Sequence, residues 1–346
     1  MVVIGAGLTG LVTARSLIDR GLRVTLLDEG ADPGGRLATR RVDGAVLDHG
    51  AQFFTVRSDE FSGLVDGWRR AGAPISVWSH GFAQASDIRA GPSGVTDVGG
   101  DSHPRYTVDG GMRTLAGVLA AGLDVRTRRR VQAIWRTDAG WRVAVDGDGP
   151  DPVPPRGTGR GTLDASALLC TPPVPRTVEL FARGATVLPD HTLTVLRAVT
   201  YDPCLALLAV VDRDPNLPAP GGVQFARGPV RWLADNARKL VSPVHAVTVH
   251  ASAPWSRTAY DTDDAGIAGP LLAWLAPWLG DAQVTAWHVT RWRHSQPRDA
   301  VAQRAVHADV GGAPVVFAGD AFGHPRVEGA ARSGLAAAAA LLSVVD

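Results

Sequence analysis

Three glycines near the start of the chain have the spacing of a phosphate-binding loop. Residues 1–10 read Met-Val-Val-Ile-Gly-Ala-Gly-Leu-Thr-Gly, so a short apolar run leads into Gly5, Gly7 and Gly10. In this pattern Gly5 permits a tight turn, Gly7 lets the backbone approach a pyrophosphate, and Gly10 lets a helix pack close to a sheet. The N–H groups that begin this helix carry partial positive charge, which stabilises phosphate. The spacing therefore predicts a loop that binds a dinucleotide.

The elements around this loop support the same chemistry. An apolar strand precedes it, a helix-like stretch follows at residues 11–19, and a second apolar strand at 24–27 ends in Asp28. A carboxylate at that point can accept hydrogen bonds from ribose hydroxyls and disfavours a 2′-phosphate. The chain has 40 glycines, so the spacing alone would be weak evidence, but its context fits a Rossmann-type domain for FAD or NAD.

Two segments beyond the second strand favour FAD. Gly34, Gly35 and Arg36 would place backbone N–H groups and a planar, permanently charged guanidinium beside the pyrophosphate. The small residues Gly50 and Ala51 would let the backbone lie against a flat ring system. Gln52 follows them and could hydrogen-bond the edge of that ring, with a surface amide as the alternative.

A matching motif lies near the other end of the chain. An apolar run at 315–318 leads into Gly319 and Asp320, followed by a glycine-containing turn and a helix. Asp320 is expected to bond the ribityl chain of FAD. The helix that starts near Val327 would direct its positive end at the flavin and stabilise negative charge there, with help from Arg326.

These residues together resemble the flavin amine-oxidase superfamily. Within it the chain is most similar to the renalases and their bacterial relatives, through short matches that run in the order of that group. The matches lie at residues 50–55, 232–236, 291–296 and 326–330, and at His250 with Trp255. The resemblance implies FAD, with the backbone of Val131 against the adenine. Because neither Cys170 nor Cys204 is near the C-terminal motif, we expect the FAD to be bound non-covalently.

The expected fold is α/β, with a Rossmann-type FAD-binding domain of the amine-oxidase type interleaved with an α+β substrate domain. Apolar runs at 205–211, 230–233 and 246–250 predict an antiparallel sheet in the second domain, covered by a helix at 265–279. We assign residues 1–72, 109–194 and 289–346 to the FAD-binding domain and residues 73–108 and 195–288 to the substrate domain. The stretch 147–161, rich in Gly and Pro, is expected to be a loop.

The renalase resemblance also implies a reaction. It is oxidation of the 2- and 6-dihydro isomers of NAD(P)H to β-NAD(P)+ by hydride transfer to flavin N5, with O2 giving hydrogen peroxide. Six residues are candidates for the substrate site: Gln52, Asn236 and His250 for the carboxamide, Arg291 for phosphate or ribose, and Trp232 and Trp292 for an aromatic cavity. A core histidine is the alternative for His250.

Lys239 is the only lysine among 35 basic residues. Many amine oxidases have a lysine that holds a water at flavin N5, and Lys239 could play that part or, with Arg293, meet phosphate or ribose. A solvated loop lysine is the favoured interpretation, because lysines are mostly exposed.

Two other functions stay open. One is a flavin amine oxidase or desaturase that acts on an amine or a biosynthetic intermediate. The other, from a different class, is a non-catalytic protein on the same fold, such as the Rab GDP-dissociation inhibitors. That alternative leaves Asp28, Arg36 and Asp320 without a purpose.

The composition fits an enzyme that acts on small molecules. The chain has 346 residues, is 45% hydrophobic and has a net charge of +1, so nucleic acid is not an expected partner. The longest apolar run, residues 335–342, is too short for a bilayer, and no signal peptide is expected before the first strand. Cys170 and Cys204 suit a reducing compartment and suggest no metal site. We therefore expect a cytoplasmic monomer or homodimer.

Overall fold

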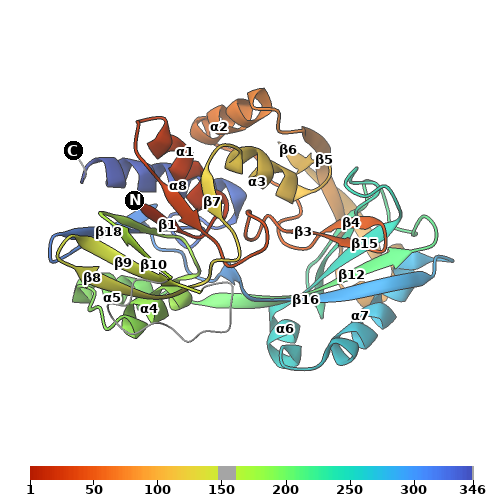
Figure 1. The fold of residues 1–346 in the computed structure, drawn as a ribbon. Helices are drawn as coiled ribbons and strands as arrows, with labels where there is room; N and C mark the ends of the chain where they lie inside the picture. The colour runs from red at the N-terminus through yellow and green to blue at the C-terminus, as the bar shows by residue number, and fades with distance from the viewer. Residues whose placement is uncertain (147–160, 345–346) are drawn as a thin grey trace. The chain divides into compact units, whose positions relative to one another are not determined.

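The computed structural model describes residues 1–146 and 161–344 and divides into two compact units (Figure 1). Unit 1 is formed by the segments Met1–Gly35, Ala116–Thr200 and Pro297–Asp346, and unit 2 by Arg36–Leu115 and Tyr201–Gln296. The borders drawn from the sequence at 72, 108, 194 and 288 differ from these. The largest difference concerns residues 36–72, which belong to unit 2 because Ala45 and Leu47 pack against its sheet.

Unit 1 is built on a six-stranded sheet in the order β17-β18-β11-β1-β2-β7. The strands are β1 (Val2–Ile4), β2 (Thr25–Leu27), β7 (Asp124–Arg126), β11 (Leu168–Cys170), β17 (Ala305–Val310) and β18 (Ala313–Ala318). All neighbouring pairs are parallel except β17 with β18. A parallel sheet with the first strand near its centre is the Rossmann arrangement, which confirms the predicted fold class.

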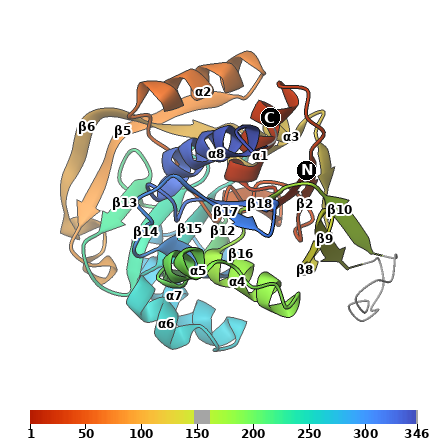
Figure 2. The ribbon, with the colours of Figure 1, turned by 90° about the vertical axis from the view of Figure 1, so that its left-hand side faces the viewer.

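Helices α1 (Leu8–Ile18) and α8 (Arg326–Leu342) lie side by side in unit 1 (Figures 1 and 2). Thr9 Oγ1 donates to the Ala330 carbonyl at 2.8 Å, and Thr13 Oγ1 donates to the Gly334 carbonyl at 2.9 Å. A Cβ at Gly334 would lie 2.8 Å from the Thr9 carbonyl oxygen. Small residues therefore let the two helices approach closely, and the first and last helices are bonded to each other.

The remaining elements of unit 1 form a small sheet and two helices. The antiparallel sheet consists of β8 (Val131–Thr137), β9 (Gly140–Val145) and β10 (Thr162–Ala165), and the helices are α4 (Val174–Arg183) and α5 (Asp190–Arg197). The predicted loop at 147–161 lies outside the described residues except for Gly161.

Unit 2 contains a seven-stranded sheet in the order β16-β12-β15-β14-β13-β5-β6. Its strands are β5 (Ile75–Ala85), β6 (Val95–Val108), β12 (Tyr201–Val211), β13 (Gly222–Phe225), β14 (Val230–Asp235), β15 (Ala246–Ala251) and β16 (Val284–Pro297). The β12-β15-β14-β13 run and the β5-β6 pair are antiparallel, whereas β13 and β5 are parallel. The predicted antiparallel sheet is thus confirmed, with one parallel join.

The other elements in the described part of unit 2 are two short strands, three α-helices and two 3₁₀ turns, with the start of a further helix. They are β3 (Thr39–Val42), β4 (Ala45–Asp48), α2 (Asp59–Arg70), the 3₁₀ turns η1 (Ile88–Ala90) and η2 (Pro92–Gly94), α6 (Ala253–Ala259) and α7 (Asp264–Leu279); α3 (Met112–Ala120) begins in unit 2.

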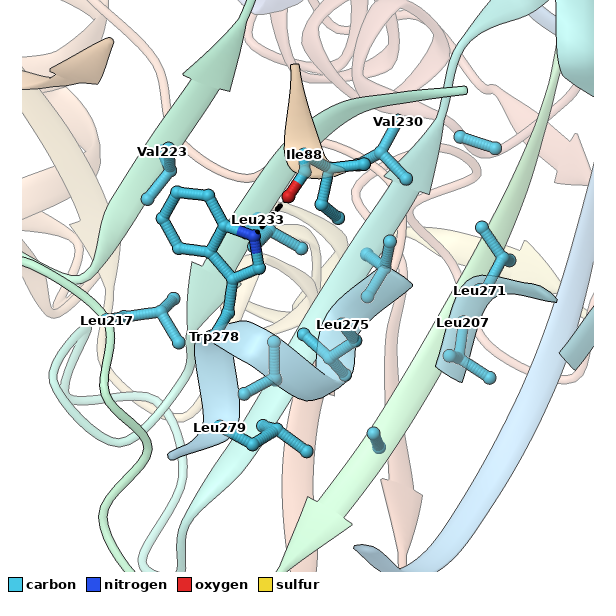
Figure 3. Packing of buried hydrophobic residues seen from close by; sticks show 14 of the residues in the cluster. Ile88, Leu207, Leu217, Val223, Val230, Leu233, Leu271, Leu275, Trp278 and Leu279 are labelled. Carbon is cyan, nitrogen blue, oxygen red and sulfur yellow. Dashed lines mark hydrogen bonds between the residues drawn. The ribbon is translucent and has the colours of Figure 1, made fainter. Parts of the chain in front are cut away.

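One face of the large sheet forms the apolar core of unit 2 with α7. Leu207, Val223 and Leu233 pack with Leu275 and Trp278 of the helix, and Trp278 Nε1 donates to the Ile88 carbonyl at 2.8 Å (Figure 3). Because side chains alternate along a strand, the neighbouring residues of the same strands occupy the opposite face.

The opposite face of the sheet is covered by the β3-β4 hairpin instead of by α7. Leu208, Val210 and Ala246 pack there against Ala45 and Leu47 of the β3-β4 hairpin. By the same alternation, Trp232 and His250 lie on the hairpin side of the sheet rather than in the α7 core. Two of the six candidate substrate residues, Trp232 and His250, therefore lie on this face.

Among residues 1–146 and 161–344, none of the helices combines the length and the apolar character needed to cross a bilayer. Within the same ranges, no group of three or more His, Cys, Asp or Glu side chains is arranged to hold a metal ion.

Candidate functional site

The glycine loop of unit 1 has the local geometry of a phosphate cradle. Gly5 has φ +96°, in the region that favours glycine, and Gly7 is the N-cap of α1. A Cβ at Gly10 would overlap the Gly5 carbonyl oxygen, whereas a Cβ at Gly7 would meet no atom within 4 Å. Gly10 thus serves helix packing, and Gly7 leaves open space at the helix N-terminus where a pyrophosphate fits.

Asp28 anchors this loop at the end of β2. Its Oδ2 accepts from the Ala6 N–H and its Oδ1 accepts from the Gly30 N–H, both at 2.7 Å. Burial raises the pKa of Asp28 above its ordinary value, while these two backbone bonds oppose the rise. A carboxylate has about four acceptor positions, so lone pairs remain for ribose hydroxyls.

The second glycine segment docks on the first within unit 1. Gly34 N–H donates to the Ala6 carbonyl at 2.8 Å and forms a parallel bridge with Gly7. A Cβ at Gly35 would lie 3.4 Å from Gly7 Cα, and Gly35 has φ +54°. The two loops therefore form one surface of backbone groups, as the chemistry of a pyrophosphate site requires.

The C-terminal motif is held by α8. Gly319 N–H donates to Ser333 Oγ of α8 at 2.8 Å, and Asp320 is the next residue in the sequence. Arg326, the first residue of α8, has φ +82°, an uncommon backbone conformation for a residue with a side chain. A Cβ at Gly329 would overlap the His324 carbonyl oxygen. Strained backbone of this kind gathers at functional sites, which supports the predicted role of this turn.

Two other predicted cofactor residues of unit 1 are also placed on ordered backbone. Val327 is buried in the first turn of α8. Val131 begins β8 and is buried, and its carbonyl accepts from Arg176 Nη2 at 3.3 Å. The contacts of both residues with FAD stay predictions.

In unit 2, Asp48 is the centre of a buried hydrogen-bond network. Its Oδ2 accepts from Lys239 Nζ at 2.6 Å, and its Oδ1 accepts from Thr39 Oγ1 at 2.6 Å and from the Met112 N–H at 2.8 Å. The Asp48 carbonyl accepts from Thr248 Oγ1 at 2.9 Å. One residue thus ties the hairpin, the start of α3 and the large sheet together.

Gln52 and His250 form a pair beside Asp48. Gln52 Nε2 donates to the Asp48 carbonyl at 2.7 Å and to the Gly50 carbonyl at 3.2 Å, and it lies 3.4 Å from His250 Nε2. Burial lowers the pKa of His250 to about 4; the backbone of His49 opposes this and Lys239 adds to it. His250 is therefore neutral at pH 7.

Four aromatic rings gather next to this pair. Phe53, Trp78, Phe82 and Trp232 have ring centroids 4.7–6.4 Å apart. Lys239 Nζ lies 5.5 Å from the centroid of the Trp78 ring. A Cβ at Gly222 would come within 2.5 Å of Phe82 and 2.9 Å of Trp232, so only a residue without a side chain fits at this position of the strand. We call these four residues the aromatic cluster.

Trp292 and His49 form a second aromatic contact in unit 2. Their rings stack with centroids 5.3 Å apart, and Trp292 Nε1 donates to the His49 carbonyl at 2.8 Å. Burial lowers the pKa of His49 to about 3, and the positive charges of Arg40 and Arg113 contribute. Two arginines therefore act on His49 in addition to its burial.

The side chains of two other predicted substrate residues, Arg291 and Asn236, are bonded within unit 2. Arg291 pairs with Asp264 and donates to the Tyr260 and Thr262 carbonyls, so it ties β16 to the α6-α7 connection. Asn236 is fully buried. Its Nδ2 donates to Thr248 Oγ1 at 2.9 Å, and its Oδ1 accepts from the Asp48 N–H at 3.3 Å. Both side chains are engaged in holding unit 2 together.

The remaining predicted cofactor residues of unit 2, Arg36, Gly50 and Ala51, lie next to one another in space. Arg36 Nη1 donates to the Ser295 carbonyl at 3.0 Å, and the Arg36 carbonyl accepts from the Ala51 N–H at 2.9 Å. A Cβ at Gly50 would overlap the Arg36 carbonyl oxygen, so glycine is required there for backbone approach. Their part in binding FAD stays a prediction.

The expectation of a solvated Lys239 is wrong. Lys239 and Asp48 are both fully buried, and their ion pair explains how a lysine is accommodated inside unit 2. Asp48 was not among the predicted site residues. Its position at the end of an apolar strand, directly before His49, was the available signal. Nothing in the sequence indicated that Lys239 was its partner.

The sequence matches two protein families. Residues 58–342 match the flavin containing amine oxidoreductase family, and residues 3–68 match the NAD(P)-binding Rossmann-like domain. The first match covers most of the chain.

Individual relatives match only short segments. Hydroxyneurosporene desaturase of Rubrivivax gelatinosus is 51% identical over 57 residues, 16% of this chain and 11% of that protein. Putrescine oxidase of Kocuria rosea is 41% identical over 66 residues, 19% of this chain and 14% of that protein. The matched part thus spans well under a fifth of the length of either relative.

Solved structures are similar over the whole chain. A wild-type putrescine oxidase bound to putrescine superimposes with a TM-score of 0.70 and 17% identity, covering 99% of this chain and 98% of that one. A provisionally assigned protoporphyrinogen oxidase from Exiguobacterium sp. 255-15 gives a TM-score of 0.70 at 16% identity, with 98% of each chain covered. At this identity the likeness shows a shared fold. The family match and the fitting cradle of unit 1 lead to one conclusion: the chain belongs to the flavin-containing amine oxidoreductases and is an FAD-dependent oxidoreductase.

Proposed function

We propose that the protein oxidises the 2- and 6-dihydro isomers of NAD(P)H to β-NAD(P)+. When bound, FAD supplies the hydride acceptor, and dioxygen then takes the electrons to give hydrogen peroxide. The residues of this chain bind and orient the dihydropyridine ring. The renalase-like motifs suggested this substrate, and the charges around His49 support it best.

The charge around the candidate site favours an anionic substrate. Arg40 and Arg113 act on His49, and the carboxylate of Asp48 is paired with Lys239. A diamine needs accessible carboxylates to bind its ammonium groups, and a cationic surrounding would repel it. A dinucleotide carries phosphates, which positive groups attract.

The aromatic cluster and its neutral neighbours suit a flat ring. Trp232 supplies apolar surface, and Gln52 and His250 supply polar groups without net charge at pH 7. Hydride transfer requires a substrate held in one orientation, and it does not require an ionised base. The group therefore serves to position the substrate.

Oxidation of an amine is the second candidate. The local identity to putrescine oxidase favours it, as does the shared fold. For that substrate Asp48 would have to exchange Lys239 for the ammonium of the amine. The buried 2.6 Å ion pair opposes this exchange, because separating it would leave a charge unpaired inside the protein.

Anaerobic mixing of the purified protein with borohydride-reduced NAD+ tests the proposal. This mixture contains the 2-, 4- and 6-dihydro isomers, and absorbance is recorded at the flavin band. We expect rapid bleaching by the 2- or 6-isomer, reversal by air, and recovery of peroxide and β-NAD+. Putrescine is mixed in parallel. Bleaching by putrescine alone would replace the proposal with amine oxidation.

A further inference from the structure

Besides His49 Nδ1, two buried polar atoms of the candidate site have no hydrogen-bond partner among the described residues. They are the acceptor Gln52 Oε1 and the donor Trp232 Nε1, on side chains that are each only 6% exposed. An unpaired polar group is costly when it is buried, so such groups require an explanation. A bound ligand that pairs with both would provide one.

The two side chains are neighbours on the same face of the sheet. Trp232 of β14 and His250 of β15 are directly opposite in the antiparallel register, and opposed side chains share a face. Gln52 Nε2 lies 3.4 Å from His250 Nε2. Phe53, the residue after Gln52, has its ring 5.6 Å from the Trp232 ring. Gln52 and Trp232 therefore flank His250 together.

The orientation of the Gln52 amide follows from its contacts. Nε2 faces two carbonyl oxygens, those of Asp48 and Gly50, and only the N–H₂ end can donate to them. Oε1 is thereby the end that is left for a ligand. Trp232 can only donate, because an indole has no acceptor in its ring plane.

We propose that Trp232 Nε1 and Gln52 Oε1 form a donor and acceptor pair that recognises a primary carboxamide. The carbonyl oxygen of such a group accepts from the indole N–H, and its N–H₂ donates to the glutamine oxygen. The pair deepens the proposed function, on which it rests, since it would distinguish a nicotinamide ring from a nicotinic acid ring at the same site.

A carboxylate satisfies only half of this pair. It can accept from Trp232, but it has no N–H for Gln52 Oε1 and would place negative charge against that oxygen. A site built to hydrogen-bond a group discriminates strongly against an analogue that lacks it. An amide should therefore be preferred to the acid, although the surrounding charges are positive.

The test uses the FAD-loaded protein and two tryptophan variants. Trp232→Phe removes the unpaired N–H. Trp78→Phe is the matched control, because it makes the same change in the aromatic cluster, but its indole N–H already donates to the Pro220 carbonyl at 3.0 Å. Binding of nicotinamide and of nicotinic acid is measured by calorimetry, and FAD retention by the ratio of flavin to protein absorbance.

We expect the wild type to bind nicotinamide about 10-fold or more tightly than nicotinic acid, given the cost of one lost buried hydrogen bond. Trp232→Phe should abolish most of this preference, and Trp78→Phe should keep it. Equal binding of the two probes by the wild type would overturn the proposal. Loss of FAD from Trp232→Phe with an unchanged amide preference would also overturn it and assign the N–H to the cofactor.

The binding assay separates this proposal from the proposed function. Amide preference in a protein that oxidises no dihydronicotinamide isomer would support the pair and refute the reaction. Turnover of the 2- or 6-isomers at equal kcat/KM for amide and acid forms would support the reaction and refute the pair.

Discussion

Lys239 Nζ lies 2.6 Å from Asp48 Oδ2, and both side chains are fully buried in unit 2. Burial lowers the pKa of Lys239, and the carboxylate of Asp48 opposes that change. The pair also has a structural consequence, because the Asp48 carbonyl orients Gln52 and the Asp48 N–H is bound by Asn236.

Breaking this ion pair should be far more costly than replacing it. Lys239→Met or Asp48→Asn alone leaves one buried charge without its partner, and about 3–5 kcal/mol of stability is expected to be lost. The double variant leaves no buried charge and should recover most of it. Thermal midpoints of the three variants check this. Equal losses in the single and double variants would contradict it.

Two glycines of the first loop should respond differently to alanine. In Gly10→Ala the new Cβ meets the Gly5 carbonyl, so both stability and FAD content should fall. In Gly7→Ala the Cβ meets no protein atom within 4 Å, so stability without FAD should be unchanged while FAD affinity falls at least several-fold. Thermal unfolding and flavin absorbance measure the two effects separately. Full FAD content in Gly7→Ala would refute the assigned cradle.

Stability should fall between about pH 6.5 and pH 4. The pKa of His250 is about 4 in the folded chain, against an ordinary 6.5, so the unfolded chain binds more protons in this interval. The contribution of neutral His250 to the free energy of unfolding is fully present above pH 6.5. It is lost as the pH falls through 4, and the loss amounts to roughly 3 kcal/mol for this residue. Denaturant melts of the wild type and of His250→Asn across the interval test this; the variant should show the smaller slope.

We expect Arg291 to have a structural role and Arg36 to have a role in binding FAD. Arg291→Ala removes the pairing with Asp264 and should lower the thermal midpoint while changing KM for the substrate by no more than about two-fold, the scale of an indirect effect. Arg36→Ala should reduce FAD affinity, since that arginine is the predicted pyrophosphate ligand. A ten-fold rise in KM for Arg291→Ala would restore the role in phosphate binding that its motif suggested.

Local signals were sufficient for the nucleotide half of the fold. The spacing of Gly5, Gly7 and Gly10 and the acid at Asp28 depend on neighbouring strands and helices, which short sequence windows describe well. Periodicity likewise located three of the seven strands of the large sheet, at 205–211, 230–233 and 246–250, and a helix at 265–279, which the structure shows as Asp264–Leu279.

The site in unit 2 depends on contacts between distant residues. Asp48 and Lys239 are 191 positions apart, and Asp48 and Thr248 are 200 apart. No local pattern indicates which polar side chain will be buried by such a partner. The same limit applied to Arg291, whose partners come from the α6-α7 connection, and to Asn236, whose amide is used internally.

The bonds from α1 to α8 have a consequence for synthesis of the protein. Thr9 and Ala330 are 321 positions apart, so α1 cannot form this contact until α8 has been synthesised. Contacts of such long sequence separation form late and slowly. Until then the nascent chain exposes the apolar side of α1, which chaperones recognise. The contact between α1 and α8 would then be completed only once α8 has been synthesised, so we expect FAD to bind after that point.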